Sequence, residues 1–269
     1  MFEISQPFQW EKCLSALPTQ QAGQYVYLIT QQEQAYVFKF LGQNAGQIIR
    51  QSFSHELNAY RPFQTEQFCA DFQIYKISDV ENINFPIPIL NDVLVMPYYQ
   101  TLNIDLSRKF SIDKKIQIFQ DICLSVQHLH DLGYIHGDLK LRHITFSNPV
   151  KLLDLAQTSK IHEVTRQAEI SATPAYMAPE LFLGENISMQ SDIYALGIIF
   201  YEILMGEKPF MGKNYQDWAT QHCQAEIPLL AIEYSLYQNI LDGMLAKLRK
   251  NRFSEIKTLI NALNLIKKT

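Results

Sequence analysis

The sequence has few cysteines, no excess of basic residues and no long apolar run. Four cysteines are spread over 269 residues and none forms a C-x-x-C pair: they are Cys13, Cys69, Cys123 and Cys223. This spacing argues against a disulfide framework and against a zinc site, and it fits a reducing compartment. The formal net charge is −4, so the chain lacks the basic balance that is typical of nucleic-acid-binding proteins.

The chain also lacks the signals of export or membrane insertion. Its longest apolar run, residues 193–205, is too short to span a bilayer and contains Glu202, so we expect a buried core helix there. Residues 1–7 have neither a basic start nor an apolar segment, unlike a signal peptide. We therefore expect a cytoplasmic protein with no membrane span, and delivery to another cell stays open. Hydrophobic residues make up 47% of the chain and charged residues 19%, which is typical of a globular protein.

One polar loop between two apolar segments carries a dense set of chemical groups. Residues 134–143 read Y-I-H-G-D-L-K-L-R-H. Alternate residues of an extended loop point the same way, so the carboxylate of Asp138, which can accept a proton, is expected beside the cation of Lys140. Residues 150–154 are predicted to form a short strand that ends in a second carboxylate, Asp154. A base, a cation and a metal-seeking carboxylate are the parts of a phosphoryl-transfer site.

These residues resemble the protein-kinase catalytic loop, H-R-D-L-K-x-x-N, and the D-F-G segment that follows it. Here the two segments read H-G-D-L-K-L-R-H and D-L-A. Further along, residues 172–180 resemble the family's G-T-x-x-Y-x-A-P-E, and residues 191–197 resemble its S-D-x-[WY]-[AS]-x-G. Because all four occur in the family's order and at similar spacing, the chain is identified as a divergent member of the eukaryotic-like serine/threonine protein kinases, with H-G-D in place of H-R-D.

The resemblance implies an α+β, two-lobed protein-kinase-like fold that forms a single domain over residues 1–269. A small β-rich N-lobe would cover residues 1–97 and a larger α-helical C-lobe residues 98–269. The hydrophobic patterns agree with this division, since apolar alternation and turn residues predict strands in the first part and helical spacing predicts helices. The expected strands are 25–29, 35–40, 72–77 and 92–96, and the expected helices are 52–60, 112–132 and 188–205.

The resemblance also implies roles for individual residues. Asp138 would orient and deprotonate the acceptor hydroxyl, and Lys140 would stabilise the transferring phosphoryl group. Lys39 matches the lysine that holds the α- and β-phosphates of ATP, although by itself it also fits an edge lysine that reaches water. Glu56, 17 positions later on a predicted helix, would be its ion-pair partner, and Asp154 would bind the metal.

The expected nucleotide contacts depart from the family at one point. Only Gly23 stands where the family has G-x-G-x-x-G, so we expect a weaker grip on the nucleotide or a differently shaped loop. Residues 93–99 resemble the hinge between the lobes, with Met96 as gatekeeper, Pro97 offering its carbonyl to the adenine and Tyr99 donating its N–H. The same segment also fits an ordinary strand end.

His143 stands where the family has an asparagine that binds a second metal ion through its oxygen. A hard ion such as Mg²⁺ favours oxygen ligands, whereas imidazole suits transition metals. The expected cofactors are therefore ATP with Mg²⁺ or Mn²⁺. Alternatively, His143 turns away and hydrogen-bonds the loop, which would leave one metal ion on Asp154.

Several other matches imply structural contacts. Thr173 corresponds to the threonine that hydrogen-bonds both catalytic residues and is typical of Ser/Thr specificity. Glu180 and Arg252 correspond to a buried ion pair, and Asp192 to a carboxylate that ties a helix to the catalytic-loop backbone. His130 is expected to be buried and hydrogen-bonded rather than a metal ligand.

The family's H-R-D arginine, which pairs with a phosphorylated residue of the activation segment, is replaced by Gly137. A new phosphate in residues 154–180 would therefore lack a strong partner. We expect activity that does not depend on phosphorylation of the hydroxyl residues there, which include Thr158, Ser159, Thr165 and Ser171.

The resemblance implies transfer of the γ-phosphoryl group of ATP to Ser or Thr hydroxyls of a protein substrate. One alternative is a pseudokinase that acts as a nucleotide-binding or scaffold module, since the missing glycines, D-L-A and His143 all favour it. Another is a small-molecule kinase, because H-G-D also occurs in antibiotic and choline phosphotransferases; the segments at 172–180 and 191–197 argue against it. The sequence carries no signal for an oligomeric state.

Overall fold

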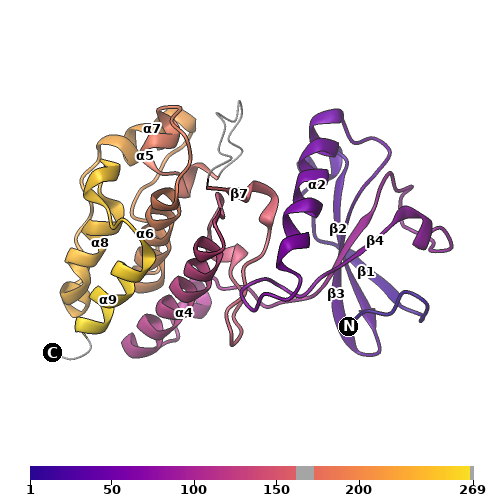
Figure 1. The fold of residues 1–269 in the computed structure, drawn as a ribbon, viewed down its shortest axis with the longest axis horizontal. Coiled ribbons are helices and arrows are strands. Elements are labelled where there is room, and N and C mark those ends of the chain that lie inside the picture. Colours follow the sequence, from indigo (N-terminus) through magenta and orange to yellow (C-terminus); the bar gives the residue numbers. More distant parts are fainter. Residues whose placement is uncertain (162–172, 267–269) are drawn as a thin grey trace. The chain divides into compact units, whose positions relative to one another are not determined.

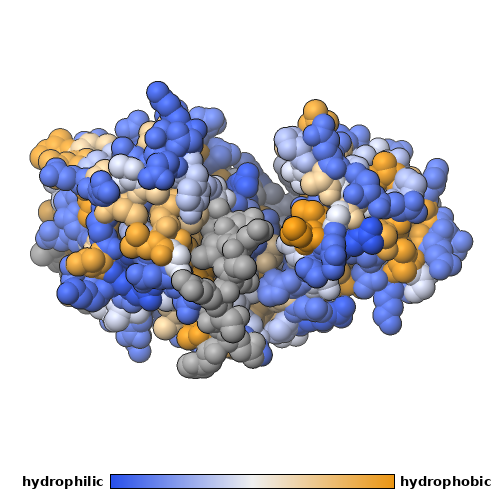
Figure 2. All heavy atoms as spheres, turned by 90° about the horizontal axis from the view of Figure 1, so that it is seen from above, coloured by the Kyte–Doolittle hydropathy of each residue, from blue (hydrophilic) through white to orange (hydrophobic). Residues whose placement is uncertain are grey.

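A computed structural model of the chain describes residues 1–161 and 173–266. The chain divides into two compact units, Met1–Gln100 and Thr101–Thr269. The first is built around a sheet and the second is mostly helical, so the predicted α+β class is confirmed (Figure 1). The surface in Figure 2 is mostly hydrophilic, with separate apolar patches on each unit.

The first unit contains a five-stranded antiparallel sheet with strand order β1-β2-β3-β5-β4. The predicted hairpin of β2 and β3 is present. Its two turn residues, Gln32 and Glu33, have φ values of 49° and 65°, which suits a tight turn between right-twisted strands. The strands are β1 Gln9–Cys13, β2 Gln24–Gln31, β3 Gln34–Leu41, β4 Gln73–Tyr75 and β5 Val93–Pro97.

The start of the chain forms part of the core, which the sequence analysis did not predict. Phe2 is 2% exposed and makes edge-to-face contacts with Phe8, Tyr36 and Phe38. Trp10 of β1 makes an edge-to-face contact with Phe38 of the same cluster. These aromatic contacts fix the first residues and β1 against the sheet, and aromatic pairs of this kind add to the stability that burial provides.

The connection from β1 to β2 contains a short helix, α1 (Leu17–Gln21), in the place where the family has its glycine-rich loop. The predicted helix at 52–60 is longer than expected and forms α2 (Gln47–Tyr60), which lies beside the sheet within the first unit (Figure 1). Its buried face carries Phe53, Glu56 and Leu57.

The second unit is organised around α6 (Met189–Met205), which is buried on nearly all sides, as expected for the apolar run. It packs against α4 (Ile112–Asp131) and α8 (Gln238–Leu245). Gly206, with φ of 75°, ends α6, as glycine often does at a helix C-terminus. The remaining α-helices are α3 Ile104–Ser107, α5 Pro179–Phe182, α7 Tyr215–Gln224 and α9 Ile256–Ile266.

None of the helices in the described residues is both long and apolar enough to cross a membrane. Short 3-10 turns complete the two units: η1 Arg61–Phe63, η2 Ile77–Asp79, η3 Leu141–His143, η4 Leu155–Gln157, η5 Pro174–Tyr176, η6 Ile232–Tyr237 and η7 Arg249–Asn251.

The prediction of a strand over residues 150–154 is wrong. A two-stranded sheet, β6 (Tyr134–Ile135) with β7 (Ser159–Lys160), lies near the catalytic loop, but the predicted segment makes only an isolated bridge from Leu152 to Ile144. Two backbone hydrogen bonds flank this bridge, from Thr145 to Lys151 and from Leu153 to His143, and the left-handed conformation of Asp154 ends the extended backbone directly after them.

Candidate active site

The backbone of the catalytic loop is held by the carboxylate of Asp192, which comes from the first turn of α6. Its Oδ2 accepts hydrogen bonds from the His136 N–H at 2.8 Å and lies 2.8 Å from the His130 Nε2. Its Oδ1 accepts the Gly137 N–H at 3.0 Å. Burial raises the pKa of Asp192, but His130 and these donors outweigh it and hold the pKa below its ordinary value. The predicted contacts of Asp192 and His130 are confirmed.

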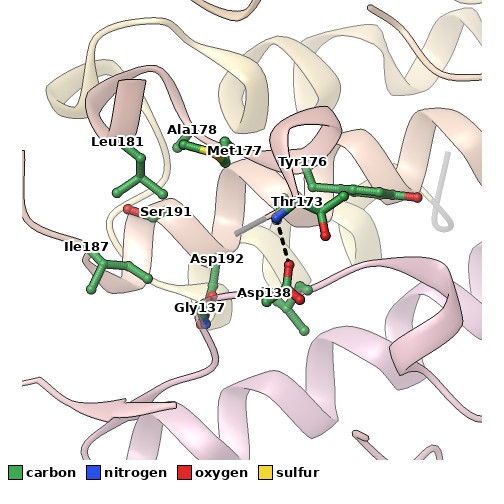
Figure 3. A pocket seen from close by; sticks show the side chains of 12 residues that line it. Gly137, Asp138, Thr173, Tyr176, Met177, Ala178, Leu181, Ile187, Ser191 and Asp192 are labelled. Carbon is green, nitrogen blue, oxygen red and sulfur yellow. Dashed lines mark hydrogen bonds between the residues drawn. The ribbon is translucent and has the colours of Figure 1, made fainter. Parts of the chain in front are cut away.

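Asp138 and Lys140 lie together, as the two-residue spacing predicted. The Asp138 Oδ1 accepts the Thr173 N–H at 3.1 Å, and its Oδ2 accepts a hydrogen bond from the Lys140 Nζ. Lys140 also donates to the Thr173 Oγ1 at 2.6 Å. Figure 3 shows Asp138 and Thr173 facing each other, with the hydrogen bond between them as a dashed line. Burial lowers the pKa of Lys140, while Asp138 acts to raise it.

His136 connects this loop to the segment that carries Asp154. It is fully buried, and its Nδ1 accepts the Asp138 N–H at 3.3 Å. The ring proton is therefore on Nε2, which donates to the Leu153 carbonyl at 3.2 Å. The sequence analysis gave His136 no role of its own, although it is the histidine of the H-G-D motif.

His143 lies between the two carboxylates. Its Nδ1 is 3.0 Å from the Asp138 carbonyl oxygen, and because a carbonyl can only accept, Nδ1 carries the proton. Burial lowers the pKa of His143 to about 3, so the ring is neutral. The lone pair is then on Nε2, which lies 3.4 Å from the Asp154 Oδ2.

Asp154 adopts a backbone conformation that few residues other than glycine adopt. Its φ is 58° and its ψ is 74°. Such conformations cost about 1–3 kcal/mol and are concentrated at functional sites, where the surroundings hold them in place. The side chain of Asp154 is 37% exposed, so its carboxylate can be reached from solvent.

The donor set of His143 and Asp154 fits one divalent cation. Two ligands with bonds of about 2.1 Å at right angles lie about 3.0 Å apart, close to the distance between the His143 Nε2 and the Asp154 Oδ2. Metal-binding histidines usually donate their other ring N–H to a carbonyl or carboxylate, as His143 does. Among the described residues, no group of three or more metal-binding side chains is found.

In the first unit, Lys39 of β3 contacts Glu56 of α2. The Lys39 Nζ lies 2.5 Å from the Glu56 Oε1, and the two side chains are 14% and 2% exposed. The predicted ion pair is therefore present. Because β3 lies between β2 and β5, Lys39 is on an inner strand, and the edge-lysine interpretation is wrong.

Gly23 is buried just before β2, with φ of 85°. A Cβ atom there would lie 2.5 Å from the Ala45 Cα, so the absence of a side chain allows close packing of the chain against itself. This packing does not test the nucleotide contact predicted for Gly23, which stays a prediction.

Residues 93–99 include the last strand of the first unit. Met96 and Pro97 end β5, where they pair with Val37 and Tyr36 of β3. The Tyr99 hydroxyl donates to the Asp71 carboxylate at 2.6 Å. The adenine contacts expected of Met96, Pro97 and Tyr99 therefore stay predictions.

Glu180 and Arg252 form the predicted buried pair. The Glu180 Oε1 accepts from the Arg252 Nη1 at 2.8 Å, and its Oε2 accepts from the Arg252 Nη2 at 2.5 Å. The Ser191 hydroxyl donates to the same carboxylate at 2.8 Å. This bidentate arrangement joins α5 to η7 through the start of α6.

Comparison with known proteins agrees with this geometry. Residues 24–264 match the protein kinase domain family. A probable serine/threonine-protein kinase PknB of Lactococcus lactis is 29% identical over 239 residues, which cover 82% of this chain and 37% of that protein. The serine/threonine-protein kinase PknB of Mycolicibacterium smegmatis is 32% identical over 165 residues, which cover 57% of this chain and 25% of that protein.

The chain belongs to the serine/threonine protein kinase family. The family uses ATP and a divalent metal ion. The match spans only 37% and 25% of the length of these two curated relatives.

Proposed function

We propose that this chain is an ATP-dependent protein kinase that transfers the γ-phosphoryl group to Ser or Thr hydroxyls of a protein substrate. The observation that carries this proposal is the network of Asp138, Lys140 and Thr173. The Asp138 carboxylate and the Lys140 ammonium group contact each other, and Thr173 hydrogen-bonds both of them. We also propose that the two units act as one kinase domain and that the protein works in the cytoplasm.

Each residue has a physical task in this reaction. Asp138 would orient the acceptor hydroxyl and take its proton, and Lys140 would offset the negative charge that develops on the transferring group. Lys39, positioned by Glu56, would hold the α- and β-phosphates. ATP would supply the phosphoryl group when bound, and Asp154 would hold a divalent ion whose positive charge would offset that of the phosphates. Most of the rate gain then comes from positioning and electrostatics.

The test is incubation of purified protein with radiolabelled ATP and either Mg²⁺ or Mn²⁺. We expect label on serine or threonine of the protein itself or of an added protein substrate. Nucleotide binding without transfer would instead identify a pseudokinase. Transfer only to an aminoglycoside or choline would identify a small-molecule kinase.

Replacing Lys39 by alanine is expected to weaken ATP binding by about 1.5–3 kcal/mol, because a charge-assisted contact with the phosphates is lost. The measurement is the rise in melting temperature on adding ATP and metal, relative to each variant without nucleotide. Lys12→Ala, at an exposed lysine of the same sheet, is the control. Equal shifts in wild type and Lys39→Ala would contradict this task for Lys39.

Replacing His143 by asparagine is expected to change which metal supports activity. If the imidazole of His143 binds the ion, wild type prefers Mn²⁺, and the amide oxygen of the variant moves the preference toward Mg²⁺. The measurement is the ratio of initial rates with the two ions, with His128→Asn on the exposed face of α4 as the control. If the ratio of rates is the same in wild type and His143→Asn, His143 is not a metal ligand, and a single metal ion bound by Asp154 is the better interpretation.

Phosphorylation of the activation segment is expected to have little effect on activity. Gly137 has φ of 82°, and a Cβ there would lie 2.7 Å from the Gln157 carbonyl oxygen, so a basic side chain cannot replace the glycine without a shift of the backbone. Thr158 is 2% exposed, which protects it from phosphorylation. Thr165 and Ser171 lie outside the described residues.

The test is a variant with alanine at Ser159, Thr165 and Ser171, whose turnover we expect to stay within about threefold of wild type, since Gly137 offers a phosphate no cation at its position in the loop. Turnover is measured for the alanine variant and for wild type both before and after phosphatase treatment. A large loss that aspartate at the same positions restores would show that the segment is regulated by phosphate after all.

A further inference from the structure

A groove of about 800 Å³ opens in the second unit beside the proposed catalytic residues. Lys140 and Thr173 form part of its wall, and its other side is formed by residues near the end of α6 and by Trp218 of α7. Because Lys140 also contacts the Asp138 carboxylate, the groove is continuous with the place where the acceptor hydroxyl would lie. A chain extends about 3.3–3.6 Å per residue, so residues close to the acceptor can reach it.

The wall of the groove is mostly apolar. Tyr176, Met211 and Trp218 line it, and Met211 is 71% exposed. Methionine adapts its shape to different partners, and aromatic side chains provide a large contact area with little loss of conformational entropy. This part of the groove therefore fits an apolar side chain of a bound peptide.

The buried carboxylate that lines this groove, Glu202, already forms an ion pair with a lysine of the same chain, Lys208. Glu202 is 1% exposed, and a carboxylate at this place would attract an arginine or lysine of a substrate. The Lys208 Nζ lies 2.8 Å from the Glu202 Oε1 and 5.2 Å from the centre of the Tyr176 ring. Lys208 thus neutralises the group that would select a basic residue.

Arg142 places an exposed positive charge on the catalytic side of the groove. This residue follows Lys140 in the loop, lines the groove and is exposed. The acidic residues of the rim are Glu207, next to Lys208 in sequence, and Asp105, which is 91% exposed and pairs with Arg108 at 3.5 Å. An acidic side chain near Arg142 gains attraction, whereas a basic one is repelled there.

We propose that this groove binds the substrate segment next to the acceptor residue, and that it selects an apolar side chain with an acidic neighbour and rejects basic ones. Arg142 and Lys208 are then the specificity-determining residues. This inference rests on the proposed kinase function, because it assigns the occupant of the groove to the same substrate.

The first experiment is phosphorylation of peptides with a fixed central Ser or Thr and one varied position at a time. We expect acidic residues to be favoured over basic ones by about fivefold at the position that meets Arg142, the size of an exposed charge pair. Arg142→Glu should remove or reverse this preference, and Lys208→Ala should raise the use of basic peptides. Lys257→Glu, on an exposed part of α9, should behave as wild type.

The second experiment measures binding without turnover. Two fluorescent peptides with the same apolar residues, one with acidic and one with lysine neighbours of the acceptor, are titrated with wild type and Arg142→Glu by fluorescence polarisation. Selective binding of the acidic peptide without any phosphorylation would support the groove and reject the kinase function. Phosphorylation with no preference, or with a preference for basic residues in wild type, would overturn the inference while the kinase function stands.

Discussion

Replacing Asp138 by asparagine is expected to lower the rate of phosphoryl transfer by about 10²–10⁴-fold, the range associated with removal of a general base. An amide cannot take up the proton of the acceptor hydroxyl. Its oxygen can still accept the Thr173 N–H that now reaches the Asp138 Oδ1 at 3.1 Å, so the loop should keep its geometry. The measurement is the initial rate at saturating ATP.

The matched control for this variant is Asp131→Asn, at an exposed residue at the end of α4, which should keep wild-type turnover. Circular dichroism and the nucleotide-induced thermal shift should be unchanged in Asp138→Asn, since the contacts of Lys39 and Asp154 remain. A rate within tenfold of wild type would show that Asp138 is not the base.

Replacing Arg252 by alanine is expected to destabilise the second unit by about 3–5 kcal/mol, because the buried Glu180 carboxylate loses its bidentate partner. Arg249, whose Nε lies 3.9 Å from the Glu180 Oε1, is then the cation that stays nearby. The Arg252 side chain is 0% exposed and that of Glu180 is 4% exposed, so water cannot replace the lost partner. The measurement is urea unfolding followed by far-UV circular dichroism, which reports on the helices of this unit.

A double variant distinguishes the contribution of the Arg252–Glu180 ion pair to stability from that of side-chain packing. Replacing Arg252 by methionine and Glu180 by leucine together should cost less than the sum of the two single changes, because no charge stays buried alone. Lys250→Ala, at an exposed neighbour, is the control and should stay within about 0.5 kcal/mol of wild type. Additive costs in the double variant would contradict a direct interaction.

The contribution of Arg252 to the stability of the second unit should also depend on pH. Burial raises the pKa of Glu180, but Arg252 outweighs burial and holds the pKa below its ordinary value of 4.5. A carboxyl group with a lowered folded-state pKa stabilises the protein above its unfolded-state pKa and loses this contribution as the pH falls below it. The difference in stability between wild type and Arg252→Ala should therefore narrow below about pH 4.5.

The sequence predicted those helices and strands in which buried positions recur as a regular pattern of apolar residues. The hairpin of β2 and β3 and the helices α4 and α6 follow from apolar spacing and turn residues. The first strand could not be found in this way, because β1 is an edge strand that exposes most of its residues. The burial of Phe2 depends on contacts with Tyr36 and Phe38, which are distant in sequence.

The site was predictable where a motif fixes local geometry, as for Asp138, Lys140 and Thr173. The orientation of His143 was not, since the sequence left a metal-binding ring and a loop-bonded ring as alternatives. In the structure the His143 Nδ1 lies 3.0 Å from the Asp138 carbonyl oxygen and its Nε2 lies 3.4 Å from the Asp154 Oδ2. The loop contact is therefore present, and metal binding by the same ring stays a prediction. Sequence also gave no sign that Lys208 would lie on Glu202, a contact made by the turn after α6.

The carboxylate of Asp192 has a consequence for amide hydrogen exchange. The N–H groups of His136 and Gly137 lie in a loop, where amides usually exchange quickly, yet both donate to a side chain that is 2% exposed and anchored in α6. They can exchange only when this contact with α6 opens. In deuterated buffer these two loop amides should therefore stay protonated about as long as those of the central helix, and Asp192→Ala should release them.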